Sequence, residues 1–276
     1  VHDIIPDFVV NVRHGIYYGK DRKSGKQYGV GGDDKVGIAI ALHALVVFGA
    51  IKVAFFKDEE VGCKGSRDAD LSFFSDCAFV IQADRKGNTD IVNSVYGVPL
   101  YSDDFAAAVK PLADRFGFTP TSGMLTDVYM LRRSGLELST FNMSAGYWNP
   151  HTDAETVVLA DVDRVWSFIF AVITQLGTTQ WPCTAVARSP WSMSRAVVVV
   201  EEEEEEEDDT EWPEFDDDDV EDADFYEAQK GAEYCTNCGE FNVVYDSTTG
   251  FNWCWGCYDY FVVENEVVDV KGAIVV

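Results

Sequence analysis

The chain has 276 residues, of which 47% are hydrophobic and 13% are aromatic, so it is long enough to bury the core of one large domain or two smaller ones. Its formal net charge of -27 argues against nucleic acid as a general partner. The sequence shows neither an apolar run of about 18 residues nor a signal-peptide pattern, so we expect a cytoplasmic protein with no membrane partner.

The negative charge is concentrated near the C-terminus. Residues 201–276 contain 26 acidic and 2 basic residues, which leaves 22 acidic and 19 basic residues in the first 200. The first 200 residues are therefore almost neutral. The acidity belongs to a tail region and says little about the ligands of the main domain.

Strands alternate with helices over the first 180 or so residues. In chain order, the pattern predicts a strand pair over 8–19, a helix over 35–48, a strand over 51–56, a short helix over 65–75, strands over 77–84 and 137–144, and helices over 103–116 and 161–176. This alternation is typical of an α/β domain with a mostly parallel central sheet flanked by helices. In such sheets, polar groups at the carboxyl ends of strands usually mark the functional site.

The composition changes after residue 188. Residues 189–230 form an acidic low-complexity stretch, with seven consecutive glutamates at 201–207, that cannot bury enough apolar surface to offset its ordering entropy. Aromatic and β-branched residues return after residue 230. We therefore predict a catalytic domain over 1–188, a linker over 189–230 and a small β module over 231–276.

Four cysteines in the last module have the spacing of a zinc ribbon. The two pairs are Cys235-x-x-Cys238 and Cys254-x-x-Cys257, which can close a tetrahedral site around a structural zinc ion. Chance or redox-active cysteines are the alternative interpretation. Because acidic residues far outnumber basic ones in this region, a protein is the more plausible partner of the ribbon than nucleic acid.

Acidic residues follow several of the predicted elements. Asp33 and Asp34 precede a helix, Glu59 and Glu60 follow a strand, and Asp84 ends another strand. Gathered at one edge of a parallel sheet, these carboxylates would repel each other unless divalent cations neutralised them. His151 would add a nitrogen ligand, which favours zinc over magnesium or calcium. The alternative is that each acid is an ordinary loop or capping residue.

Five motifs in a fixed order resemble those of the co-catalytic zinc exopeptidases, the group that contains peptidase T, carboxypeptidase G and the zinc aminopeptidases. The motifs are GGDDKVG (31–37), FFKDEEVG (55–62), VIQAD (80–84), SGMLTDVYM (122–130) and NMSAGYWNPHTDAE (142–155). The similarity covers residues 1 to about 180. It implies a metal-dependent exopeptidase that hydrolyses short peptides.

The resemblance also implies a role for each matching residue. Asp33 would bridge two divalent ions, Glu60 and His151 would complete the ligands of one, and Asp84 would bind the other. Glu59 would be the general base that takes a proton from water and later gives it to the leaving amine. Zinc is the expected metal, and cobalt or manganese could replace it.

The sequence departs from this family at two points. The His-x-Asp motif expected before the first motif is absent, and His2 does not have its spacing, so we expect an N-terminal part to be missing. The interval between Asp84 and His151 is too short for an inserted lid or dimerisation domain. A second hypothesis is therefore a catalytically inactive, peptidase-like binding or regulatory protein that acts through the ribbon and the linker.

Overall fold

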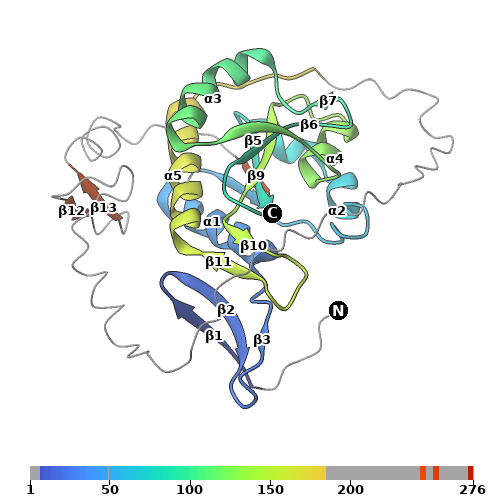
Figure 1. The fold of residues 1–276 in the computed structure, drawn as a ribbon. Helices are drawn as coiled ribbons and strands as arrows, with labels where there is room; N and C mark the ends of the chain where they lie inside the picture. Colours follow the sequence, from blue (N-terminus) through green and yellow to red (C-terminus); the bar gives the residue numbers. More distant parts are fainter. Residues whose placement is uncertain (1–6, 49, 185–242, 247–250, 255–272, 276) are drawn as a thin grey trace.

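The computed structural model describes residues 7–48, 50–184, 243–246, 251–254 and 273–275. These residues form two main β-sheets with helices packed on the larger one (Figure 1). Within this part of the chain, no helix combines the length and the apolar character that crossing a membrane requires.

The larger sheet has seven strands. Its order is β4 (Lys52–Ala54), β14 (Ala273–Val275), β5 (Val80–Arg85), β9 (Thr140–Ser144), β6 (Asp90–Val95) and β7 (Val98–Pro99), and β8 (Thr119–Gly123) also pairs with β6. The strands from β4 to β9 run parallel, whereas β6 runs antiparallel to β9 and parallel to β8. The predicted α/β class is confirmed, with a sheet that is mixed beyond β9.

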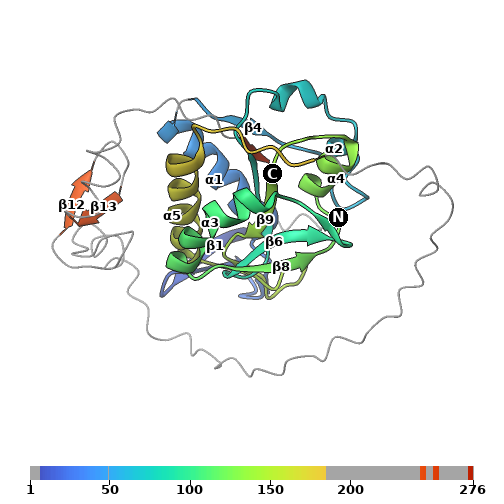
Figure 2. The ribbon, with the colours of Figure 1, turned by 90° about the horizontal axis from the view of Figure 1, so that it is seen from above.

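Helices cover both faces of this sheet (Figure 2). One apolar cluster contains residues of α1 (Gly32–Phe48), α3 (Asp103–Phe116) and α5 (Leu159–Leu176), and the other contains residues of α4 (Asp127–Ser134) and of the 3-10 helix η1 (Leu71–Phe74). Neighbouring residues of β5 alternate between them, since Ile81 joins the first cluster and Val80 the second. This is the period of two that a strand buried on both faces requires.

The smaller sheet is antiparallel and contains five strands. They are β1 (Phe8–Arg13), β2 (Ile16–Asp21), β3 (Gln27–Tyr28), β11 (Thr156–Val158) and β10 (Tyr147–Trp148). Sequence analysis predicted only the first strand pair. Because β2 pairs with β11, this sheet ties the N-terminal hairpin to the loop that joins β10 to β11 and carries His151.

Strongly periodic helices were predicted well, and short or polar elements were missed. The predicted helix over 103–116 coincides with α3, which begins after the capping hydroxyl of Ser102 and ends at the left-handed Gly117. A single helix was predicted over 65–75, but the structure has two shorter elements there, α2 (Lys64–Arg67) and η1. Strand β8 was missed because its sequence, TPTSG, is polar and contains a proline.

The C-terminal segment differs most from the predicted domain boundaries. Residues 273–275 were assigned to the ribbon module, but they form β14 in the larger sheet. Strands β12 (Val243–Asp246) and β13 (Phe251–Cys254) form a hairpin, and Cys254 ends its second strand. The linker over 189–230 and three of the four ribbon cysteines lie outside the described residues, so the linker and the zinc ribbon stay predictions.

Candidate metal centre

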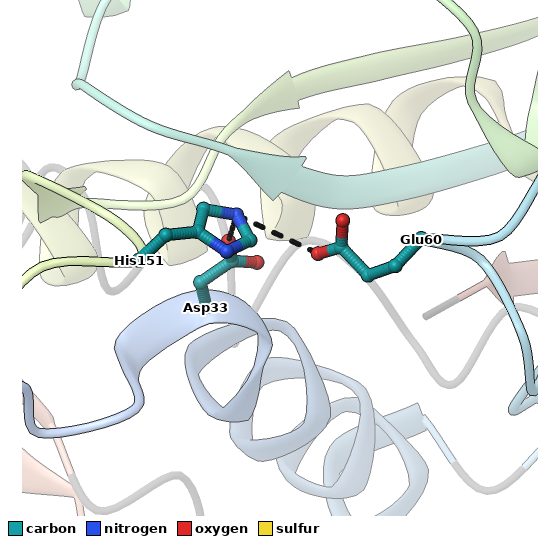
Figure 3. A group of neighbouring side chains, drawn as sticks. All are labelled: Asp33, Glu60 and His151. Carbon is teal, nitrogen blue, oxygen red and sulfur yellow. Dashed lines mark ion pairs between the residues drawn. The ribbon is translucent and has the colours of Figure 1, made fainter. Parts of the chain in front are cut away.

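Three side chains from distant parts of the sequence converge at one point (Figure 3). The Nε2 atom of His151 lies 3.0 Å from Oδ2 of Asp33 and 3.5 Å from Oε1 of Glu60. One ligand atom from each of the three residues lies within 4.8 Å of the other two. Sequence analysis predicted these three residues as ligands, and the structure brings them together.

The spacing of these atoms fits a divalent ion. In a tetrahedral zinc site with bonds of about 2.0–2.1 Å, neighbouring ligand atoms are about 3.3 Å apart. The two distances from His151 are close to that value, and the donor set of one imidazole and two carboxylates suits zinc. The side chains of Glu60 and His151 are 69% and 60% exposed, so the centre is open to solvent.

Asp33 is positioned where the chain enters α1. Asp33 and Asp34 have non-helical backbone angles, and regular helix follows from Lys35, as the sequence predicted. A Cβ atom on the preceding Gly32 would come within 2.6 Å of Val157 and 2.9 Å of Tyr147. The absence of a side chain at Gly32 therefore lets this turn pack against β10 and β11, the two strands that flank the His151 loop.

Glu155 joins the Asp33 turn to the His151 loop. Its buried carboxylate accepts hydrogen bonds from the backbone N–H groups of Gly31, at 2.5 Å, and of Asp33, at 3.0 Å. Because one carboxylate accepts both charge-assisted hydrogen bonds, it fixes the position of the Asp33 turn relative to the His151 loop. Sequence analysis missed this role, although Glu155 lies only four residues after His151.

The loop after β4 carries Glu59 and Glu60. Its chain turns back on itself, because the carbonyl oxygen of Glu59 accepts hydrogen bonds from the N–H groups of Gly62 and Cys63. A Cβ atom on Gly65 would come within 2.7 Å of the Lys57 carbonyl oxygen, so this close return also needs a glycine. The tight turn places Glu60 beside Asp33 and His151 and leaves Glu59 in a more buried position.

Asp84 lies close to this group but outside the set of three. Its Oδ2 atom accepts a hydrogen bond from Nε2 of Gln82 at 3.2 Å. Its backbone N–H donates to the Asn142 side chain, whose Nδ2 in turn donates to the Asp84 carbonyl oxygen. Gln82 and Asn142 were not predicted as site residues. The sequence carries a signal only for Gln82, which is a polar residue among the apolar ones that begin β5; Asn142 lies in β9, TFNMS, which contains other polar residues.

Burial and mutual repulsion raise the pKa values of two of the carboxyl groups. Burial, followed by the charges of Asp33 and Glu59, raises the pKa of Asp84 to about 9. Burial, followed by the charge of Asp127, raises the pKa of Glu59 to about 7. These are the shifts expected of crowded acids, which a cation would reverse.

We expect the metal-free protein to become less stable as the pH rises. A carboxyl group with a higher pKa in the folded state takes up a proton on folding, so stability falls between its ordinary pKa near 4 and the raised value. For Glu59 and Asp84 that window extends to about pH 7 and pH 9. Thermal unfolding of the chelator-treated protein from pH 5 to pH 9 measures the slope.

Zinc should reduce this slope, because metal binding displaces the protons. The Asp84→Asn variant is the matched control, since it keeps the size of the side chain but cannot ionise. Its metal-free form should lose less stability with pH than the wild type. Equal slopes for the two proteins would contradict the assignment to Asp84.

Tyr147 contacts Asp33, one of the three converging residues. It is buried, and its hydroxyl group donates a hydrogen bond to Oδ1 of Asp33 at 3.3 Å. Burial and the charges of Asp84 and Asp33 raise the pKa of this hydroxyl, so it stays protonated and keeps donating. Tyr147 therefore supports Asp33, with its hydroxyl satisfied inside the protein.

No protein-family model and no curated protein matches the sequence. Among solved structures, aminopeptidase PepT from Bacillus cereus is similar to the chain, with a TM-score of 0.46 and 14% identity over 60% of this chain and 75% of that chain. The dodecamer PhTET1-12s has a TM-score of 0.40 and 22% identity over 58% of this chain and 52% of its own. At this level of similarity, neither structure identifies the role of a residue.

Proposed function

We propose that the chain is a metal-dependent peptidase that removes terminal residues from short peptides. The observation that carries this proposal is the convergence of Asp33, Glu60 and His151 at a solvent-open point, with the carboxyl group of Glu59 next to it in the sequence. A ligand set beside a half-buried carboxyl group that is not itself a ligand is the arrangement that metal-assisted hydrolysis needs.

In this proposal Asp33, Glu60 and His151 hold one zinc ion. A divalent ion, when bound, would lower the pKa of a water molecule and polarise the carbonyl group of a peptide. Asp84 would contribute to a second ion together with Asp33. Among the residues that the structure describes, however, only the first group brings three such ligands within bonding range.

Glu59 is the general base of the proposed reaction. Its carboxyl group takes a proton from the attacking water molecule and later delivers it to the leaving amine. Both transfers need a carboxyl group that can take up a proton and release it again near the working pH. Burial raises the pKa of Glu59 to about 7 in the metal-free protein, and a bound ion would lower it from that value towards the range in which the group can act as a base.

The C-terminal cysteines belong to the proposal as a separate structural element. Cys235, Cys238, Cys254 and Cys257 would hold a structural zinc ion in a ribbon, and the acidic linker over 189–230 would connect it to the peptidase domain. The spacing of the two Cys-x-x-Cys pairs supports this assignment. A protein is the proposed partner of the ribbon.

The test combines a zinc titration with a hydrolysis assay on short peptides. At a free zinc concentration of 100 times the dissociation constant, the binding of one zinc ion should raise the free energy of unfolding by about 2.7 kcal/mol. The His151→Ala variant should lose both this stabilisation and the hydrolysis of peptides. The ribbon is the same in both proteins, so their difference isolates the candidate metal centre. His14→Ala, at an exposed turn, is the control. Equal zinc stabilisation in wild type and His151→Ala would overturn the ligand assignment.

A further inference from the structure

A buried thiol lies directly behind Glu59. The Sγ atom of Cys63 is 3.8 Å from Oε1 of Glu59, which is within hydrogen-bonding range for sulfur, and no part of Cys63 is exposed. A thiol is a weak hydrogen-bond donor, and an ionised carboxylate is a strong acceptor. The contact therefore gives Glu59 a donor from inside the protein.

The backbone holds Cys63 in this place at a steric cost. Cys63 has φ 50 and ψ 48, the left-handed conformation that is unfavourable for a residue with a Cβ atom. Its N–H group donates to the carbonyl oxygen of Glu59 at 2.8 Å. A glycine would adopt this backbone without strain but would carry no thiol. Both the main chain and the side chain of Cys63 thus contact the same glutamate.

Asp127 and Ser66 lie on the other side of the thiol. The buried carboxylate of Asp127 accepts a hydrogen bond from Oγ of Ser66 at 2.5 Å. Burial raises the pKa of Asp127, and hydrogen bonds from Ser66 and Cys63 oppose that rise. The thiol thus lies between the carboxyl groups of Glu59 and Asp127; its Sγ atom is 3.8 Å from Oε1 of Glu59, and Asp127 has a further donor in Ser66.

The thiol group stays neutral in this environment. Burial, followed by the charges of Asp127 and Glu59, raises the pKa of Cys63 above its ordinary value. A thiolate there would add a third negative charge to two carboxylates. Cys63 therefore carries its proton and can donate it in the contact with Glu59.

We propose that Cys63 is a positioning residue for Glu59, whose thiol donates a hydrogen bond that fixes the carboxylate beside Glu60 and Asp33. The inference rests on the proposed function, in which Glu59 transfers the proton. Cys63 does not touch the substrate in this scheme. It restricts the rotamers of Glu59, while Asp127 and Ser66 keep the thiol in place.

The kinetic test uses the full chain with zinc. Cys63→Ala removes the donor, and we expect kcat to fall roughly tenfold with little change in KM, because only the orientation of the base is lost. Cys63→Ser keeps a donor, and we expect it to recover most of that loss. Cys77→Ala, at a buried cysteine in the second apolar cluster, should keep the wild-type rate. Equal rates for the alanine and serine variants would overturn the proposal.

An infrared measurement tests the contact without relying on activity. The S–H stretching band of Cys63, isolated by subtracting the spectrum of Cys63→Ala, should move when Glu59→Ala removes the acceptor. An unchanged band would overturn the inference, whatever the hydrolysis rate. Conversely, a protein that shows the shift but hydrolyses no peptide would refute the proposed function and leave the Cys63 contact standing.

Discussion

Replacing Glu59 by glutamine is expected to lower the rate of peptide hydrolysis by about two to four orders of magnitude, which is the usual contribution of a general base. Glutamine has the size of glutamate but cannot accept the proton of the attacking water. The loop geometry should survive, because the backbone bonds from Gly62 and Cys63 go to the carbonyl oxygen of residue 59. Hydrolysis rates measured at saturating zinc give the effect directly.

Two controls separate chemistry from folding in this experiment. The zinc affinity of Glu59→Gln should stay close to that of the wild type, because Glu59 is not one of the three converging ligands. Glu137→Gln makes the same chemical change at an exposed position that precedes β9. This end of β9 points away from the site, so the variant should hydrolyse peptides at the wild-type rate. A Glu59→Gln protein that binds its metal and cleaves peptides at the wild-type rate would refute the role of Glu59.

Replacing Ile274 by alanine is expected to lower the free energy of unfolding by about 2–5 kcal/mol, the range for large-to-small changes in a core. Ile274 is fully buried and belongs to the apolar cluster under α1, α3 and α5. It lies in β14, which pairs in parallel with β4 on one side and β5 on the other. The urea midpoints of wild type and variant measure the difference.

The same substitution should weaken zinc binding. Strand β4 is held in the sheet through β14, and the loop after β4 carries Glu60. A loosened β14 therefore loosens Glu60, one of the three proposed ligands, relative to Asp33 and His151. Val46→Ala, at a position in α1 that is 78% exposed, is the control and should change stability by less than about 0.5 kcal/mol. An Ile274→Ala protein as stable as that control would show that β14 is dispensable.

Much of the fold could be predicted because it depends on local periodicity. The helix over 103–116 and the buried strand that became β5 follow from patterns of apolar residues with the periods of a helix and a strand. Acids at the ends of such strands predicted where charge would gather. Asp33, Glu60 and His151 do converge, and the raised pKa values of Asp84 and Glu59 are the expected sign of crowding.

Contacts between distant segments could not be predicted in this way. Nothing in the residues around position 274 shows that they pair with strands near positions 53 and 81. The bonds from Gly31 and Asp33 to Glu155 also span more than 120 residues. Pairing of this kind depends on which edges and cavities remain once the other elements have packed, and that information is spread over the whole chain.

The sequence by itself determined the α/β class, the order of the main elements and the kind of chemistry that a set of acids and one histidine can support. Only the tertiary structure decided that β14 lies between β4 and β5, that Glu155 joins the Asp33 turn to the His151 loop, and that Cys63 lies behind Glu59. The physical reason is the distance along the chain over which each effect acts. Propensity and periodicity act over a few residues, whereas a catalytic arrangement is made by hydrogen bonds and packing between segments that meet only after folding.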